Sequence, residues 1–161
     1  MKVDPSFFKP IVDATRKTLS IQCSVESQPG KPFMKSDPTR ITKGVEIAGV
    51  IGLTSESYNG SIALCMTRPV FYSVMNGMLG EECEESIEEL SDGIAELLNI
   101  IFGDAKAVLN EEGHAIQMAI PVVLVGQNLQ TAAGESANST VVLPFNTDAG
   151  EFFIEIALDK S

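Results

Sequence analysis

The chain has 161 residues, 44% of them apolar and 20% charged, which is the composition of a single soluble globular domain spanning 1–161. Its net charge of −11 would repel phosphate backbones and anionic lipid, so we expect neither nucleic acid nor a membrane as a partner. The chain has one histidine and three widely spaced cysteines, so it lacks the ligand spacing of a zinc site and we expect no metal ligands. The unpaired cysteines and the absence of a signal-peptide pattern predict a cytoplasmic protein.

The N-terminal part of the chain predicts a helix and then a strand. Asp4 and Pro5 are typical of a helix start, and apolar residues then recur every three or four positions, which predicts a helix over 5–20. Residues 20–28 alternate between β-branched or apolar and polar types, which predicts a strand. The next stretch, 28–40, is rich in proline and predicts a loop or an irregular sheet edge.

The middle of the chain predicts a hairpin followed by a short helix. Two apolar runs, 44–55 and 60–67, flank a turn that contains Asn59-Gly60, and this pattern is typical of a β-hairpin. Thr67 then precedes a proline and an apolar stretch, which predicts a short capped helix that ends at Gly80.

A second long helix is predicted over about 86–110, after the acidic run 81–90, which we expect to be a solvated loop and helix start. Further apolar and β-rich segments follow it, and the last two predict another hairpin. These segments are 114–126, 139–146 and 151–158. The predicted fold class is therefore α+β: a mainly antiparallel sheet with two long helices packed on one face, plus one short helix.

One face of the second long helix carries an unusual set of residues: Asp92, Glu96, Asn99 and Gly103. At about 100° per residue these four positions share an arc of about 60°, whereas the apolar residues gather on the opposite side. The apolar set comprises Leu90, Ile94, Leu97, Leu98, Ile101, Ala105 and Val108. We expect the apolar set to pack on the sheet and the polar set to face outward.

Two readings of this polar face stay open on the residues alone. Acids and amides are usual on the outer face of any amphipathic helix, so the face could be simply solvated. However, asparagine has poor helix propensity, and a glycine in a helix interior costs about 1 kcal/mol relative to alanine. Gly103 also removes a side chain where another molecule could come close. These features favour a docking or active face.

The pattern D-x3-E-x2-N-x3-G on a long helix, with ELLNIIFGDAK around it, resembles the signature of the CheC/CheX chemotaxis phosphatases. The opening helix, the hairpin, the long helix and the closing hairpin are similar to CheX-like members from end to end, a fold shared with flagellar switch proteins. The resemblance implies a phosphatase that hydrolyses the aspartyl phosphate of a CheY-like response regulator. The first helix has no ExxN pattern, so one site is expected.

The resemblance also assigns roles to individual residues. Glu96 and Asn99 match the glutamate and asparagine of the family, the first pairing with a lysine of the partner and the second positioning water. Asp92 would either contact the partner or cap local donors, and Gly103 would let the surface of the partner lie close against the helix. Pro121 matches a structural proline of the family. No cofactor of its own is expected, because Mg²⁺ would come bound to the response regulator.

The resemblance further implies a homodimer formed by strand pairing across an exposed sheet edge. The main alternative is a non-catalytic module, either an adaptor that binds a response regulator or a relative of the flagellar switch proteins. An unrelated α+β hydrolase has little support, because the sequence offers no nucleophile–base set.

Overall fold

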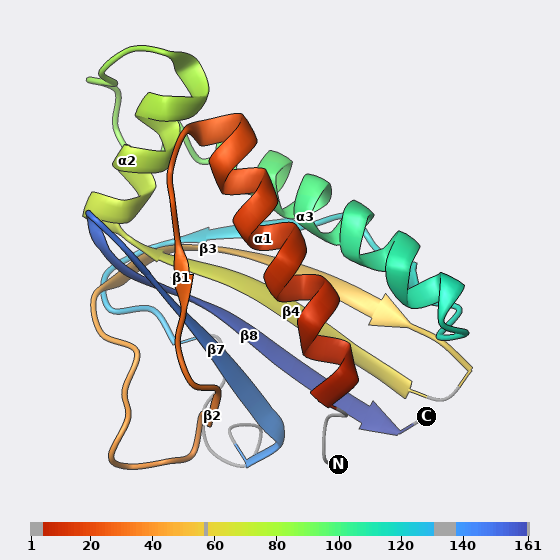
Figure 1. The fold of residues 1–161 in the computed structure, drawn as a ribbon. Helices are drawn as coiled ribbons and strands as arrows, with labels where there is room; N and C mark the ends of the chain where they lie inside the picture. The colour runs from red at the N-terminus through yellow and green to blue at the C-terminus, as the bar shows by residue number, and fades with distance from the viewer. Residues whose placement is uncertain (1–4, 57, 131–137, 161) are drawn as a thin grey trace.

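The computed structural model describes residues 5–56, 58–130 and 138–160, and in this part of the chain helices cover one face of an antiparallel sheet (Figure 1). The helical elements are η1 (Pro5–Phe7), α1 (Phe8–Cys23), α2 (Arg68–Leu79) and α3 (Asp92–Glu111). The strands are β1 (Gln28–Pro29), β2 (Phe33–Met34), β3 (Val45–Thr54), β4 (Tyr58–Thr67), β5 (Gln117–Met118), β6 (Val122–Val125), β7 (Thr140–Thr147) and β8 (Gly150–Lys160).

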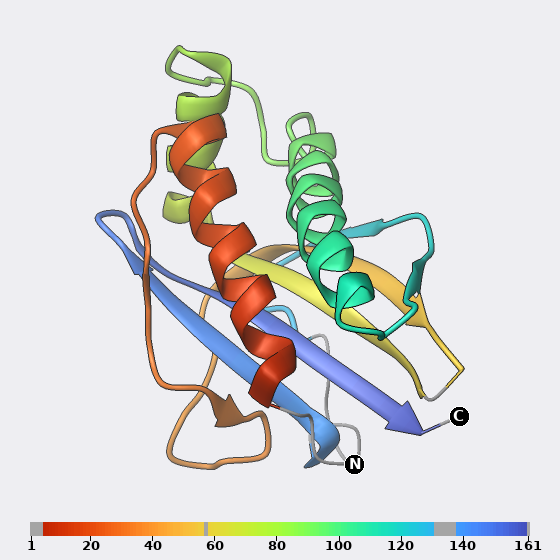
Figure 2. The ribbon, with the colours of Figure 1, turned by 45° about the vertical axis from the view of Figure 1, so that its right-hand side comes forward.

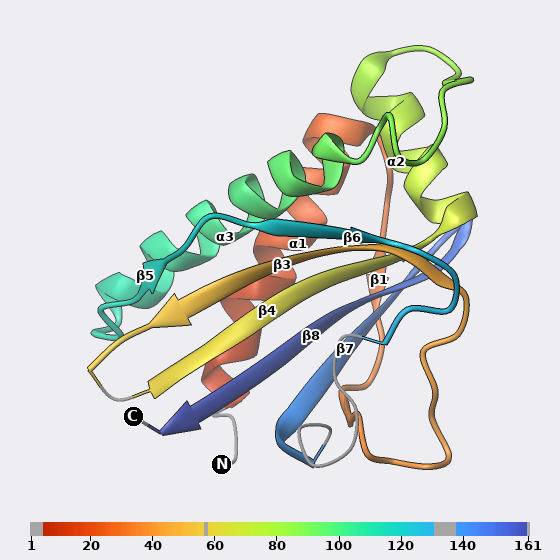
Figure 3. The same cartoon turned by 180° about the vertical axis from the view of Figure 1, so that it is seen from behind.

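The sheet has eight strands in the order β1-β7-β8-β4-β3-β5, with β2 also pairing with β7 and β6 also pairing with β3. Every one of these pairs is antiparallel. Figure 3 shows the face away from the helices, where β5 and β6 follow one another along the outer side of β3. The predicted α+β class, including the antiparallel sheet, is confirmed.

The two long helices lie side by side on the same face of the sheet, as Figure 2 shows, and α2 lies at one end. They bury one main core against the strands, with Ile11 and Leu19 from α1, Leu97 and Ile101 from α3, and a sheet layer that includes Phe152. Packing on the sheet fixes which side of α3 is buried. The opposite side of α3 is therefore left outward.

The predicted strand at 20–28 is wrong, because α1 continues to Cys23. Cys23 is buried at helical spacing from Leu19, whereas Ile21 is 67% exposed, so the alternation of apolar and polar residues here belongs to a helix. Ser24 then adopts a left-handed conformation (φ 54°) and the backbone N–H of Val25 donates to the carbonyl of Leu19. The expected cap at Asp4 lies outside the described residues.

The predicted hairpin of β3 and β4 is present, but Asn59 and Gly60 do not form its turn. Both lie within β4, where Asn59 is opposite Thr54 and Gly60 is opposite Leu53. A Cβ on Gly60 would overlap the carbonyl oxygen of Ala157 in β8. The glycine therefore permits the close approach of a neighbouring strand rather than a turn.

The long helix α3 begins at Asp92, six residues later than predicted. The residues just before it form a turn instead, in which the Glu89 N–H donates to Ser86 Oγ over 3.2 Å and the Ser86 hydroxyl donates to the Glu89 carboxylate. The short helix α2 is present where it was predicted and is followed by Gly80, which is left-handed (φ 73°). The predicted cap is wrong, because the side chain of Thr67 makes no capping hydrogen bond. None of the helices in the described ranges is long and apolar enough to cross a bilayer.

The face of the sheet away from the helices carries a smaller buried cluster and a buried ion pair. Val142 and Phe153 belong to this cluster. Lys35 Nζ lies 2.8 Å from an Oε atom of Glu155, and the two side chains are only 7% and 4% exposed. The pair ties the irregular segment after β2 to the sheet, at the face remote from α3.

Candidate functional site

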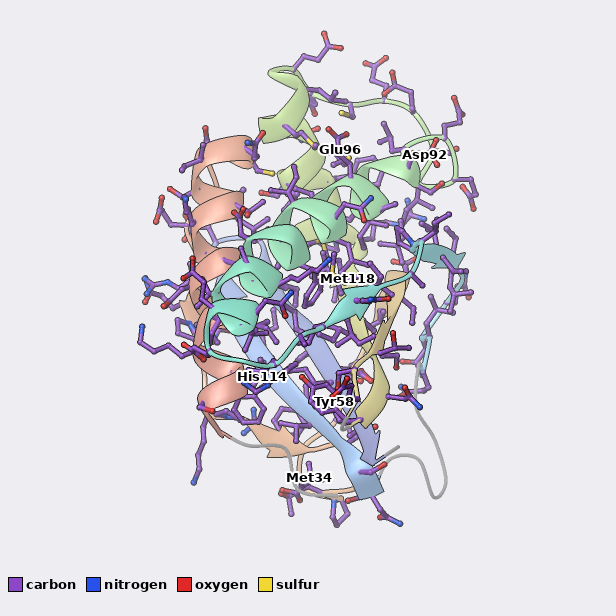
Figure 4. All side chains as sticks on the ribbon, turned by 90° about the vertical axis from the view of Figure 1, so that its right-hand side faces the viewer. Met34, Tyr58, Asp92, Glu96, His114 and Met118 are labelled. Atoms are coloured by element: carbon purple, nitrogen blue, oxygen red, sulfur yellow. The ribbon has the colours of Figure 1, made fainter. Side chains whose placement is uncertain are left out.

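The four residues of the predicted stripe, Asp92, Glu96, Asn99 and Gly103, are all exposed on α3. Figure 4 looks onto this helix and shows Asp92 and Glu96 along its first half. The opposite side is buried as the helical periodicity predicts, and it also includes two residues that the prediction omitted. The buried set is Ile94, Leu97, Leu98, Ile101, Phe102, Ala105 and Leu109. α3 thus presents the stripe on a rigid rod whose orientation the core fixes.

Within the described residues, the side chains of Asp92, Glu96 and Asn99 make no hydrogen bond or ion pair with the rest of the chain. Asp92 lies in the first turn of α3, where its negative carboxylate interacts favourably with the positive end of the helix macrodipole. The Asn99 amide keeps both its oxygen acceptor and its NH₂ donor available. These three groups can all be used by a molecule that docks on the helix.

The two glycines of α3 have different environments. A Cβ on Gly93 would overlap the Sδ atom of Met75 in α2, so this glycine serves the packing of the protein's own helices. A Cβ on Gly103 would meet nothing within 4 Å. Nothing in the described part of the chain requires a glycine at 103, although it costs about 1 kcal/mol relative to alanine.

The prediction that Val108 belongs to the buried face is wrong, since this side chain is 42% exposed. It points to the flank of α3 that faces α1 and lines a groove of about 470 Å³ between the two helices. Leu90, also assigned to that face, precedes the helix and is half-buried. Lys17 on α1 and Ala107 on α3 line the same groove, and sequence reasoning singled out neither.

The first helix offers no second copy of the stripe. Its Asp13 forms an ion pair with Lys9, with an oxygen–nitrogen distance of 2.7 Å, and the Nε of Arg16 donates to the carbonyl of Ser27. These groups are engaged within the chain, unlike Glu96 and Asn99. Pro121 lies between β5 and β6, where its missing N–H separates the two short strands.

The cysteines do not have the environment of nucleophiles. Cys23 and Cys65 are buried, and burial raises the pKa of Cys23 to about 11. The pKa of Cys83 is raised by desolvation and then by the carboxylates of Glu85 and Glu81, as expected for a thiol amid acids. His114 is half-buried, with Nδ1 3.2 Å from the Tyr58 hydroxyl. Among the described residues no cluster of three or more His, Cys, Asp or Glu side chains could hold a metal ion.

Solved structures of CheX and CheC-like proteins are similar to this chain over almost its whole length. A CheC-like superfamily protein from Shewanella sp. PV-4 is 34% identical, with a TM-score of 0.85 over 98% of this chain and 99% of that one. The chemotaxis protein CheX from Vibrio vulnificus is 31% identical, with a TM-score of 0.85 over 96% and 99%. Comparison with curated protein sequences found no match.

More distant structures share the fold. A CheX from Borrelia burgdorferi, solved as a CheX–CheY–BeF3–Mg²⁺ complex, is 24% identical, with a TM-score of 0.74 over 94% of this chain and 97% of that one. FliY from Thermotoga maritima is 17% identical, with a TM-score of 0.69 over 98% and 92%. The family model described as "Chemotaxis phosphatase CheX" matches residues 47–146, which is more than half of the chain. By this match and by the likeness of the whole fold, the chain belongs to the CheX chemotaxis phosphatase family.

Proposed function

We propose that this protein hydrolyses the aspartyl phosphate of a CheY-like response regulator in the cytoplasm, acting as a single domain with one site on α3. The observation that carries the proposal is Gly103, a costly helix glycine with open space around it, in line with Glu96 and Asn99. A bare position on an exposed helix is useful when a second protein lies against it. Family membership supplies the chemical class of that protein.

Asn99 holds the attacking water. An aspartyl phosphate is a mixed anhydride, and the response regulator itself surrounds the phosphoryl group, so the missing component is a water in line with the bond that breaks. The amide oxygen accepts a hydrogen bond from water while the NH₂ group donates, and the amide does not titrate near neutral pH. Asn99 therefore positions the water and does not deprotonate it. Correct positioning can lower a barrier by several kcal/mol.

Glu96 fixes the register of the partner. It lies about one turn before Asn99 on the same side of α3, so both side chains enter one pocket together. Its carboxylate pairs with a lysine of the response regulator, which aligns the two proteins and speeds their encounter. Asp92, one turn further toward the N-terminus, contacts the rim of the same partner.

The metal of the reaction belongs to the response regulator. When bound there, Mg²⁺ neutralises charge on the phosphoryl oxygens. The relative from Borrelia burgdorferi that was crystallised with CheY, BeF3 and Mg²⁺ supports this division of roles. This chain then contributes side chains to a site whose ion the partner holds.

Replacing Glu96 with glutamine should lower kcat/KM about tenfold, mainly through KM, because it removes a charge pair that forms during docking. The loss should shrink as salt rises, since salt already screens the pair in the wild type. Steady-state phosphate release at 50 mM and 500 mM salt measures both effects. Glu151→Gln makes the same charge change on β8 and should leave kcat/KM unaltered.

Replacing Gly103 with leucine should weaken binding of the response regulator at least about tenfold while the protein stays folded. The leucine meets no atom of its own chain but occupies the space that the partner needs. Calorimetric titration with the activated response regulator measures the affinity, and circular dichroism verifies the fold. If Gly103→Leu binds the response regulator as tightly as the wild type, the partner does not lie against residue 103.

The protein acts as a homodimer joined through the β6 edge of the sheet. The other edge is formed by β1 and β2, which have two residues each and include Pro29, so it is a poor template for pairing. β6 instead presents Val122 and Leu124, which are 60% and 42% exposed. These exposed apolar side chains on an edge strand favour pairing with a second copy.

Val122→Lys should convert the dimer to a monomer, because it places a charge on each side of the paired edges. Light scattering after size-exclusion chromatography gives the molar mass directly. Met34→Lys introduces the same charge on β2 and should leave the dimer intact. A dimeric Val122→Lys protein, or a monomeric wild type, would refute this interface.

The second candidate is a non-catalytic adaptor, and the availability of the stripe for docking fits it as well. The two functions differ in stoichiometry. A phosphatase shortens the lifetime of many phosphorylated regulators per molecule, whereas an adaptor needs equimolar amounts and leaves that lifetime unchanged. Asn99 favours the phosphatase, because a pure binding face has no need for a water-positioning amide in mid-helix.

A further inference from the structure

We propose that the groove between α1 and α3 is a second contact surface for the same response regulator, so that one partner occupies both the stripe and the groove. The inference rests on the proposed function and extends its site by one flank of α3. The groove measures about 470 Å³, and Lys17 from α1 together with Asp104, Ala107 and Val108 from α3 line it.

The groove is continuous with the stripe. Ala107 follows Gly103 by one helical turn on the same side of α3, and Asp104 adjoins that glycine in the chain. Gly103 and Ala107 are both exposed and both lack a long side chain. A surface that lies against Gly103 therefore meets no obstacle before it reaches the groove.

The size of a protein contact favours a single occupant. One helical turn spans about 5.4 Å, whereas a specific protein interface covers about 800 Å² on each partner. Ala107 lies eight residues, or about 12 Å along α3, from Asn99, which is within the reach of a contact of that size. A response regulator whose phosphoryl group lies at Asn99 therefore extends over Ala107 to the groove when it docks on this flank of α3.

The side chains that line the groove indicate which kind of segment of the response regulator would bind there. Val108, which is 42% exposed, gives the groove an apolar side chain that a docked segment would bury. On the α1 wall Lys17 is exposed and has no ion-pair partner among the described residues, whereas the neighbouring Lys9 is paired with Asp13. Asp104 and Glu112 stand on the α3 side, and neither has an ion-pair partner among the described residues. An amphipathic segment with an apolar side chain toward Val108, a carboxylate toward Lys17 and a basic side chain toward the two acids is complementary to this groove.

The test compares two groove variants with two matched controls. Val108→Glu and Lys17→Glu alter the groove, while Met34→Glu and Lys31→Glu make the same changes at exposed residues on and before β2. Figure 4 shows Met34 at the far end of the molecule from Glu96. The probe is a CheY-type response regulator of the source organism, activated with beryllofluoride and Mg²⁺, and calorimetry measures its affinity.

We expect Val108→Glu to raise Kd at least about tenfold and Lys17→Glu to raise it about threefold, with both controls unchanged. In turnover assays the same variants should raise KM while kcat at saturation stays within about twofold, because Asn99 is untouched. Circular dichroism verifies that the variants fold. Val108→Ala is a milder second variant, because it keeps the groove apolar but removes part of the apolar side chain, and it should give a smaller rise in Kd.

The outcomes separate the groove from the phosphatase activity. Wild-type affinity in Val108→Glu and Val108→Ala, together with a phosphatase-active wild type, overturns the groove and leaves the proposed function standing. Weakened binding in these variants, with a wild type that binds the regulator but does not shorten its lifetime, supports the groove and overturns the phosphatase. A wild type that does not bind the activated regulator overturns both.

Discussion

Asn99→Ala should reduce kcat for hydrolysis of the phosphorylated response regulator about 10²- to 10³-fold while changing its affinity less than about threefold. The reduction is what enzymes lose when one group that is preorganised for the transition state is removed. Affinity should persist, because Glu96, Asp92 and the bare surface at Gly103 remain. Steady-state phosphate release gives kcat, and calorimetry with the beryllofluoride-activated regulator gives Kd.

Two further substitutions sharpen the role of the amide. Asn99→Asp keeps the shape but places a negative charge next to the phosphoryl group, so it should be as inactive as the alanine variant. Asn110→Ala removes an amide from the last turn of α3, whose oxygen accepts from the backbone N–H of Ile116, and should leave kcat unchanged. Comparable loss of kcat in Asn99→Ala and Asn110→Ala would point to a general effect on α3 rather than to positioned water.

Gly77→Ala should destabilise the protein by about 2–3 kcal/mol, the largest stability effect expected from so small a change. Gly77 lies in α2 directly against the end of α1. A Cβ there would overlap the backbone carbonyl oxygen of Cys23 and come within 2.6 Å of its carbon. The obstacle is backbone, so a side-chain rotation cannot relieve it and the two helices must separate. Thermal unfolding should show a Tm lower by about 5–10 °C.

Gly103→Ala is the matched control, because it is the same substitution in the interior of another helix. An added Cβ at 103 meets nothing within 4 Å, so only the helix propensity changes. The variant should gain about 0.5–1 kcal/mol in free energy of unfolding, or about 1–4 °C in Tm. Equal Tm changes in the two variants would contradict the assignment of Gly77 to helix packing and Gly103 to an external partner.

The stripe on α3 could be predicted from sequence because a single helix determines it. The angles between Asp92, Glu96 and Asn99 depend only on helical geometry, so the wrong estimate of where the helix begins did not alter them. The buried side followed from the same geometry once a sheet was predicted to lie beneath it. The strands after Thr140 were equally visible, because they are short apolar runs between turn residues and both of their faces are buried.

The features that could not be predicted depend on neighbours distant in sequence. Gly60 is typical of a hairpin turn, but the close approach of β8 places it inside a strand. Val108 matches the apolar side of α3, yet α1 lies beside this flank and leaves a groove. The extension of α1 to Cys23 could not be predicted, because a short alternation of apolar and polar residues is compatible with both a strand and a helix.

The most direct test of the central claim is the half-life of a phosphorylated CheY-like regulator in the presence of this protein at one hundredth of its concentration. If Asn99 positions water for hydrolysis, the wild type should shorten the half-life at least about tenfold at this ratio, and Asn99→Ala should leave it at the value without protein. An unchanged half-life with the wild type, or equal shortening by the two proteins, would contradict the account.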